Sequence, residues 1–562
     1  MTHLRDDGVN FPNSHSVFPT FTTANASALA TGHQLGDTGD FSNTIYTVRP
    51  VASAKGSVTP FLENDAVLAE MDADFGGNYL GEPTVLEAAR RAGYGTASTG
   101  KLGPVLIQDH LARDGRTTII LDDATGSASG IPLASAVSAV LRDAGLPVAA
   151  PGRGENGKSG DATTPGTTMP NRVQQDWLTD AATRVVLPML KARGRPFAMI
   201  FWSRDPDGTQ HNQGDSLNSL VPGINGPSTM AAIRNADGDL AQLRAALDRL
   251  GLADTTDIIV TSDHGFSTIA KDSRPSPAAR ERYPNVPAGL LPPGFLALDL
   301  ATALRMPLFD PEAKNAPVAP GAHPSRGNAL LGPDPAHPAI VVAANGGSDL
   351  LYLPDKHRAL ARRVVAALLA QDYVSGIFVD DALGPIPGTL PLSAIGLKGS
   401  AATPTPSIVV NFRSAASGCV VPANCQTEIA DTNLQQGQGM HGNFGRGDTL
   451  NFTAAIGPDF RRGFVDAAPV SNADFGRTIM ALLGLAPPAR GHLAGRVLAE
   501  AMPGGKVPRF ARQRRASSPA SNGLRTILNY QTVGRARYLD TAGFAGRTAG
   551  LDVDDAHQPR AK

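Results

Sequence analysis

Five side chains of metal-ligand type stand in three short motifs that lie far apart in the chain. Asp207 and His211 are four residues apart, and Asp263 and His264 directly follow an apolar, strand-like run. His441 lies in a Gly-Met-His-Gly segment, where the glycines leave room for an ion. Carboxylate and imidazole together are ligands that zinc-like ions prefer. Two such ions can hold both oxygens of an in-line phosphoryl displacement, so these motifs predict a two-metal site.

Alternating strands and helices are predicted upstream of these motifs. Strands bounded by such helices predict an α/β fold with a mostly parallel central sheet and helices on both faces. In that architecture ligands gather beyond the carboxyl ends of the strands, where Asp207 and Asp263 fall. The expected strands are residues 94–99, 117–121, 197–202 and 258–260, and the expected helices are residues 83–91, 173–191 and 233–250.

Other segments depart from this alternation and define the expected domain organisation. Residues 1–502 are expected to form the catalytic domain, with a Pro-rich insertion at about 273–338. Residues 503–562 lose the pattern and are expected to form a C-terminal appendage. The Gly-rich stretch at 151–170 should be a mobile loop. It contains a match to the P-loop pattern at 152–159, but the glycines and proline that follow cannot start the helix that a phosphate cradle needs.

Composition excludes some classes of function. The chain has 50 basic and 51 acidic side chains, and this balance argues against a nucleic-acid-binding surface. No apolar run is long enough to span a bilayer. The only two cysteines, Cys419 and Cys425, are close together in a loop. This spacing favours a local disulfide and an oxidising compartment over two free thiols.

A cluster of hydroxyl side chains at 19–25 lies at a predicted strand-to-helix turn. A nucleophile in this place would be exposed at a helix amino terminus, although Thr and Asn are also ordinary helix caps. Together with Thr31-Gly32, Asn43 and the metal motifs, this segment resembles the type I phosphodiesterase/nucleotide pyrophosphatase family of the alkaline phosphatase superfamily. The resemblance covers roughly residues 1–500, including 455–460 and 472–484, which look like the closing strand and last core helix of that family.

The resemblance implies an alkaline phosphatase-like fold and a role for each motif. Thr22 matches the nucleophile, and Asn43 matches the side chain that donates to a non-bridging phosphate oxygen. Two divalent ions, with Zn²⁺ favoured by the ligand types, are implied as cofactors. The implied ligands are Thr22, Asp263 and His264 for one ion and Asp207, His211 and His441 for the other.

One ligand of the family pattern has no counterpart. The family places a metal-binding aspartate at the end of an opening strand, upstream of the nucleophile. Asp6 and Asp7 belong to a predicted helix end that stops at Gly8, so neither is assigned to that role. We therefore expect that Met1 is an internal methionine, and that a longer native chain carries the aspartate, its strand and a signal for export to the periplasm or the exterior.

These observations predict metal-dependent hydrolysis of phosphodiester or phosphoanhydride bonds through a threonyl-phosphate intermediate. The expected substrate is a small phosphate ester such as a nucleotide. A phosphomonoesterase or phosphonate hydrolase of the same superfamily, and a catalytically impaired binding protein of that fold, are the alternatives. A sulfatase is disfavoured, because no Cys or Ser lies in the context that formylglycine formation requires. A P-loop protein that depends on Lys158 is the alternative from another class.

Overall fold

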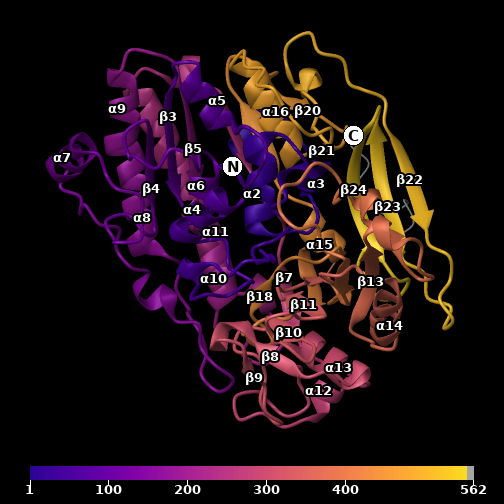
Figure 1. Cartoon of the computed structure of the whole chain (residues 1–562). Helices are drawn as coiled ribbons and strands as arrows, with labels where there is room; N and C mark the ends of the chain where they lie inside the picture. The colour runs from indigo at the N-terminus through magenta and orange to yellow at the C-terminus, as the bar shows by residue number, and fades with distance from the viewer. Residues whose placement is uncertain (420, 553–562) are drawn as a thin grey trace.

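The computed structural model describes residues 1–419 and 421–552 and shows an α/β protein (Figure 1). Helices and strands alternate through the first half of the chain, so the α/β class predicted from the sequence is confirmed. The strands are divided among several sheets, and only part of them run parallel.

A parallel three-stranded sheet forms the centre of the amino-terminal half. Its order is β4 (Thr118–Asp122), β3 (Gly95–Gly100), β5 (Phe197–Trp202). Apolar residues of these strands pack against α7 (Ser135–Asp143) and against a long helical segment. Figure 1 shows these helices on the left, beside the sheet. Helix α5 (Val85–Arg91) precedes β3 in the chain and begins with a capping box between Thr84 and Glu87.

The helix predicted at 173–191 is present but is not a regular α-helix throughout. It consists of α8 (Arg172–Asp180), a π-helical turn (Ala181–Val186) and α9 (Leu187–Ala192). The second long helix, α11 (Pro227–Arg249), begins with a proline at its first position, where the missing N–H costs nothing.

A second sheet has the order β20 (Phe464–Val465), β1 (Val9–Asn10), β19 (Thr453–Ile456), β6 (Ile258–Thr261). Helix α1 (Thr2–Asp7) ends at Gly8 and leads into β1, as the sequence predicts. Within the described residues, β5 and β6 each have a strand partner on one edge only. Every residue of both strands is half-buried, whereas β3 and β4 are fully buried.

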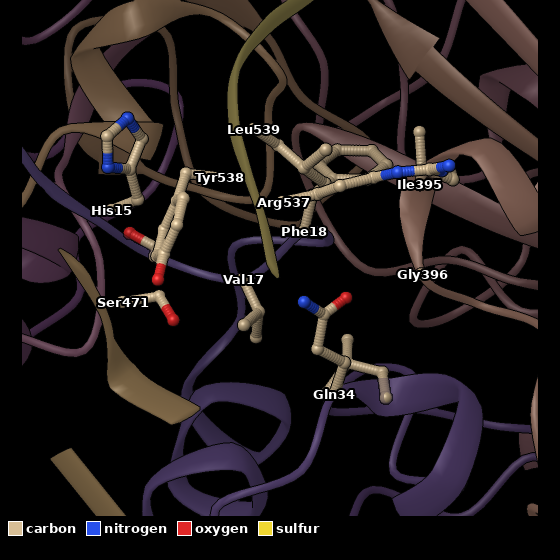
Figure 2. A pocket seen from close by; sticks show the side chains of 12 residues that line it. His15, Val17, Phe18, Gln34, Ile395, Gly396, Ser471, Arg537, Tyr538 and Leu539 are labelled. Atoms are coloured by element: carbon tan, nitrogen blue, oxygen red, sulfur yellow. The ribbon is translucent and has the colours of Figure 1, made fainter. Parts of the chain in front are cut away.

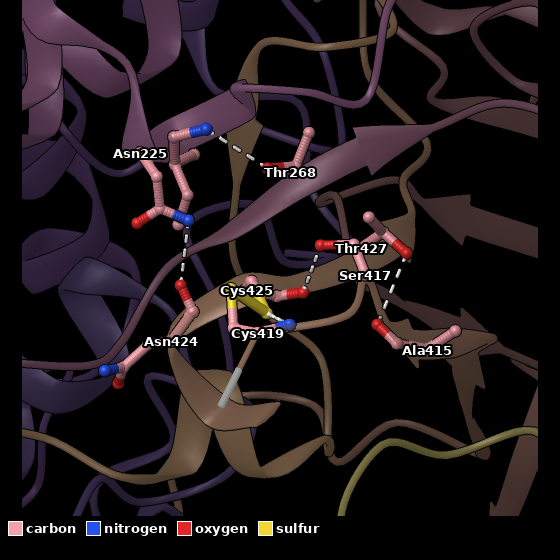
Figure 3. Close-up of a disulfide and its surroundings, with 9 residues drawn as sticks. Asn225, Thr268, Ala415, Ser417, Cys419, Asn424, Cys425 and Thr427 are labelled. Atoms are coloured by element: carbon pink, nitrogen blue, oxygen red, sulfur yellow. Dashed lines mark hydrogen bonds between the residues drawn. A yellow bond between two sulfur atoms is a disulfide. The ribbon is translucent and has the colours of Figure 1, made fainter. Parts of the chain in front are cut away.

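A third sheet holds the segments that lead to the site. Its order is β16 (Ser414–Ala416), β17 (Gln426–Ile429), β7 (Ser267–Ala270), β18 (Gly439–Met440). Cys419 and Cys425 form a disulfide in the connection between β16 and β17, which confirms the predicted pairing. Figure 3 shows this disulfide beside Asn424, whose carbonyl oxygen accepts a hydrogen bond from Asn225 at 2.9 Å.

The largest sheet is mainly antiparallel and includes part of the Pro-rich segment. Helices α12 (Pro277–Arg280), α13 (Phe295–Leu304) and α14 (Arg358–Leu369) accompany it. The Pro-rich residues contribute three short strands that pair with one another, and one of them, β10, also pairs with β11, so this segment is integrated into a sheet. The order is β14 (Leu390–Pro391), β13 (Val374–Val379), β15 (Ile408–Phe412), β12 (Ser348–Tyr352), β11 (Ile340–Ala343), β10 (Ala329–Leu331), β8 (Leu308–Asp310), β9 (Ala316–Pro317).

The carboxyl-terminal residues form an antiparallel sheet of β22 (Ala511–Ala516), β23 (Ile527–Val533) and β24 (Ala536–Gly543), seen on the right of Figure 1. Leu528, Leu539 and Ala542 of this sheet belong to the largest apolar core. Residues 553–562 of the expected appendage lie outside the described residues, and the domain limits stay a prediction. No helix within the described residues combines the length and apolar character needed to cross a bilayer.

The remaining short elements complete the frame around the site. Helix α2 packs against α16, and β21 of the two-stranded pair β2–β21 also contacts α16. Their bounds are α2 (Thr22–Thr31), α3 (Leu35–Thr38), α4 (Asp65–Asp74), α6 (Pro104–Ile107), α10 (Asp207–Asn212), α15 (Arg446–Thr449), α16 (Asn472–Leu482), β2 (Ser14–His15) and β21 (Val470–Ser471).

Candidate metal centre

Three strand ends and one helix start bring the predicted ligands together. Asp207 begins α10 shortly after β5, which places His211 one turn further along the same helix. Asp263 and His264 follow β6. His441 follows β18, which pairs antiparallel with β7 and so runs beside the segment that carries His264. Strand pairing and the short loops after the strands therefore bring ligands that are distant in sequence close together in space.

The first cluster contains Asp207, His211 and His441. One ligand atom of each lies within 4.8 Å of the others. Oδ1 of Asp207, which is buried and accepts no hydrogen bond, lies 3.1 Å from Nε2 of His211. The rings of His211 and His441 are 5.2 Å apart between centroids. This arrangement offers one carboxylate and two imidazoles to a single ion.

The second cluster contains Thr22, Asp263 and His264. Nε2 of His264 lies 3.3 Å from Oγ1 of Thr22 and 3.2 Å from Oδ2 of Asp263. The ring of His264 stacks on that of His441, with 3.8 Å between centroids, so the two clusters are neighbours. Thr22 is the first residue of α2, so its hydroxyl stands at the amino terminus of that helix.

The three histidines share one tautomer. Nδ1 of His211, His264 and His441 lies 2.8 to 2.9 Å from a backbone carbonyl oxygen, and only an N–H can donate there. Each Nε2 is then free to present a lone pair to the centre of the site. Backbone carbonyls that orient ligand imidazoles in this way are typical of metal sites.

Two carboxylate oxygens therefore face nitrogen lone pairs at hydrogen-bond distance, at Asp207–His211 and at Asp263–His264. Two such acceptors repel each other unless a proton or a cation stands between them. In the first cluster, whose three ligand atoms lie within 4.8 Å of one another, the arrangement fits a divalent ion.

Electrostatics differ between the two clusters, and those of the first suit metal ligands. Burial opposes ionisation of Asp207, but the charge of Lys101, together with the adjacent His211, outweighs it and holds the pKa of Asp207 well below its usual range. Burial, with the neighbouring His264 and His211, holds the pKa of His441 well below its usual value. Burial would also lower the pKa of His264, yet the adjacent Asp263 carboxylate outweighs it and raises that pKa.

Asn43 lies beside the nucleophile candidate and is held at both ends of its amide. Oδ1 accepts a hydrogen bond from the backbone N–H of Thr23 at 2.9 Å, and Nδ2 lies 3.4 Å from Oε1 of Glu63. The amide donor therefore points to the Glu63 carboxylate, and Oδ1 is anchored to the residue that follows Thr22. An amide donor here can bind a phosphoryl oxygen.

The sequence analysis missed two cations and a carboxylate at the site. Nζ of Lys101 lies 3.4 Å from Oγ1 of Thr22, 2.9 Å from Oε1 of Glu63 and 3.1 Å from Oδ2 of Asp207. Arg204 donates to the same Oδ2 of Asp207 at 2.8 Å. Lys101 directly follows β3, so the rule that pointed to Asp207 could also have found it.

The P-loop match does not form a phosphate cradle. Residues Gly154–Gly157 form a short 3₁₀ turn, and Lys158 is exposed and pairs with Glu155. The loop instead braces α10, because Asn156 donates to Oγ1 of Thr209 at 2.8 Å and Arg153 donates to the carbonyl oxygen of Gly208 at 2.7 Å. The P-loop alternative is therefore wrong, and the loop has a supporting role.

Asp6 and Asp7 lie at the end of α1 and are exposed. Asp6 pairs with Arg5 at 2.8 Å. Neither side chain has a contact with the ligand clusters among those that the structure describes, in agreement with leaving both unassigned.

A small pocket near the carboxyl-terminal sheet also contains His and Ser side chains. Figure 2 shows His15, Ser471 and Tyr538 on one side of it and Gln34 on the other. Nε2 of His15 pairs with Oδ1 of Asp540 at 2.8 Å, and Nδ1 lies 3.2 Å from a backbone carbonyl. Ser471 is occupied in the capping box of α16. The ring of His15 and the hydroxyl of Ser471 are therefore each held by structural hydrogen bonds of their own.

Comparisons with known proteins agree with this chemistry. A family model described as type I phosphodiesterase/nucleotide pyrophosphatase matches residues 1–279, a range that contains Thr22 and all the ligands except His441. No curated protein sequence matches the chain.

Solved structures of ectonucleotide pyrophosphatase/phosphodiesterase 5 are distantly similar. The murine protein is 15% identical over 87% of this chain and 91% of that chain, with a TM-score of 0.46. The human protein gives the same identity and coverage, with a TM-score of 0.42. An inactive murine variant in complex with AMP also matches, with a TM-score of 0.46.

Proposed function

Because the chain belongs to the type I phosphodiesterase/nucleotide pyrophosphatase family, we propose that Thr22 is its nucleophile and that two divalent ions assist it. Membership makes the protein a hydrolase of phosphodiester or phosphoanhydride bonds. The observation that carries the finer proposal is the place of the Thr22 hydroxyl, 3.3 Å from a lone-pair-bearing nitrogen of His264 and beside the Asp207 cluster.

The proposed reaction consists of two in-line displacements. In the first, Oγ1 of Thr22 forms a bond to phosphorus while the bond from phosphorus to the leaving oxygen breaks. In the second, the oxygen of a water molecule forms the new bond and the Thr22–phosphorus bond breaks, which returns the hydroxyl. The threonine stands at the amino terminus of α2, where the helix dipole favours negative charge.

The protein residues have distinct tasks in this scheme. Asn43 donates to a non-bridging oxygen of the phosphoryl group and holds it in front of Thr22. Thr22, Asp263 and His264 would hold one ion, and Asp207, His211 and His441 would hold the other. When bound, such ions lower the pKa of the hydroxyl and neutralise the charge that develops on the leaving oxygen. Zn²⁺ is the proposed metal, because the donors are imidazole and carboxylate.

The family description favours nucleotides and related small phosphate esters as substrates. We also propose that the protein works in an oxidising compartment, the periplasm or the exterior, because its only two cysteines form a disulfide.

The decisive experiment compares an aryl phosphomonoester with a bis-aryl phosphodiester, both with zinc. Diester hydrolysis that vanishes in Thr22→Ala but persists in Thr31→Ala would support the proposal. Thr31 is the matched control, because it is a buried threonine of the same helix whose hydroxyl bonds only within that helix and to the next turn. Preferred monoester hydrolysis would support the phosphatase alternative. Zinc binding without hydrolysis of either ester would support the binding protein.

A further inference from the structure

A buried ion pair stands directly against the proposed nucleophile. Oε1 of Glu63 and Nζ of Lys101 are 2.9 Å apart, with side-chain exposures of 12% and 4%. The lysine also lies 3.4 Å from Oγ1 of Thr22. Oε1 of Glu63 also accepts a hydrogen bond from Nδ2 of Asn43 at 3.4 Å. One carboxylate oxygen thus accepts from both Lys101 and Asn43, and the lysine also contacts the threonine.

The backbone fixes the two members of this pair relative to each other. Lys101 directly follows β3, and Glu63 directly precedes Asn64, the amino-terminal cap of α4. Gly103 holds the two segments in contact, because a Cβ at this position would lie 2.7 Å from Cα of Glu63. Its φ of +90° is also one that other residues rarely adopt. The backbone therefore fixes the position of the Glu63–Lys101 pair in the site.

Glu63 is the carboxylate that still neutralises Lys101 when the proposed ion and the substrate are bound. Asp207 also lies near the lysine, but its Oδ2 accepts from Arg204 at 2.8 Å and its Oδ1 faces His211. Its charge is shared with those groups and with the proposed ion. Glu63 has no second cation among the ion pairs of the described residues. The pair consequently adds the ammonium donor of Lys101 to the phosphoryl site and no net charge.

Net charge matters because the candidate substrates differ in it. A phosphodiester, or an internal phosphate of an anhydride, carries one negative charge at neutral pH, whereas a phosphomonoester is largely a dianion. A free lysine would favour the dianion. A free glutamate would repel it more strongly than it repels a monoanion. We infer that Glu63 and Lys101 together form a charge-neutral specificity element that matches the site to singly charged phosphoryl groups. This inference rests on the proposed function.

The two members of the pair should shift selectivity in opposite directions. Glu63→Gln leaves Lys101 without its counter-charge and should lower the diester-to-monoester ratio of kcat/KM by roughly tenfold, the scale of one partly screened charge at about 5 Å. Lys101→Met leaves the carboxylate unpaired and should raise that ratio, because monoester turnover falls further than diester turnover. The double variant should return towards the wild-type ratio.

Matched controls exist on the surface. Glu155 and Lys158 form an exposed ion pair, and Glu155→Gln and Lys158→Met make the same chemical changes there. These controls should leave the ratio unchanged. Zinc content is measured for every variant, so that a lost ion is not mistaken for altered selectivity.

Binding gives a readout that does not depend on turnover. Calorimetry of the zinc-loaded protein at pH 8 compares inorganic phosphate, mainly a dianion, with dimethyl phosphate, a monoanion. Glu63→Gln should tighten phosphate binding roughly tenfold and change dimethyl phosphate binding much less. An unchanged preference between the two ions in this variant, or no binding of either ion to wild type and variants, overturns the inference.

The two proposals fail in different ways. An inactive wild type that still shows the charge-dependent shift in binding contradicts the proposed hydrolysis and keeps the specificity element. An active wild type whose ester ratio is the same in Glu63→Gln contradicts the specificity element alone.

Discussion

The buried carboxyl of Asp40 should make the stability of the protein fall as pH rises, and its replacement should remove that dependence. Oδ1 accepts from Oγ1 of Thr23 at 2.8 Å, and Oδ2 accepts from the hydroxyl of Tyr79 at 3.1 Å. No cation contributes to its electrostatics, and burial raises the pKa of Asp40 to about 7. Hydroxyl donors lower the cost of the charge but do not cancel it.

The direction follows from proton linkage. In the unfolded chain the carboxyl loses its proton near pH 4, whereas in the folded protein it keeps the proton up to about pH 7. The folded state therefore holds the extra proton between these values, and stability is lost as pH rises through this window. A shift of roughly three pH units corresponds to about 4 kcal/mol at full ionisation.

Asp40→Asn cannot ionise, so it escapes this loss. It gives up one acceptor oxygen, which costs about 1 kcal/mol. We expect the variant to be less stable than wild type by about 1 kcal/mol near pH 3.5 and more stable by about 3 kcal/mol at pH 8. The two stability curves should therefore cross at about pH 4.5.

Thermal unfolding of both proteins from pH 3.5 to 8.5 measures this crossing, because other titrating groups cancel in the difference between variant and wild type. Asp355→Asn, at an exposed aspartate, is the matched control and should show no pH-dependent difference. A difference for Asp40→Asn that stays constant over the whole range would refute the reasoning.

Three further changes test the site and its supports. His211→Ala should remove one zinc ion per chain, as measured by metal analysis after dialysis; unchanged zinc content would exclude His211 as a ligand. Asn156→Ala should lower kcat/KM roughly tenfold through loss of the brace on α10, whereas Lys158→Ala should leave it unchanged. Gly103→Ala should destabilise the protein by about 1–3 kcal/mol through its clash with Glu63 and its positive φ, and an unaltered unfolding temperature would contradict this.

Elements with strong local signals could be predicted from the sequence. The strand expected at 197–202 and the helix expected at 83–91 are present. The π-helical turn at 181–186 could not be found, because apolar periodicity does not distinguish it from an α-helix. The strands at 308–310 and 316–317 in the Pro-rich segment could not be predicted from the sequence either. Strands this short show no alternation and are defined only by pairing with distant residues.

The same distinction applies to the site. The motifs of Asp207, His264 and His441 combine ligand types with favourable places in the fold, and the structure brings these residues together. Lys101 stands in an equally favourable place, but a lysine is not a metal ligand and gave no chemical signal. Glu63 gave no signal of either kind, because only the close approach of the Gly103 backbone brings it to the lysine.

The single-sided pairing of β5 and β6 has a consequence for how the protein behaves at high concentration. Both strands keep a row of backbone N–H and C=O groups without strand partners in the part of the chain that the structure describes. From Phe197 to Trp202 no charge or proline interrupts this row, so it lacks the features by which natural proteins discourage strand addition. An extended segment of any neighbouring molecule can dock there by backbone hydrogen bonding alone. Solutions of this polypeptide should therefore form oligomers and then aggregates as concentration increases, and a peptide with alternating N-methylated amides that covers this edge should keep the chains apart.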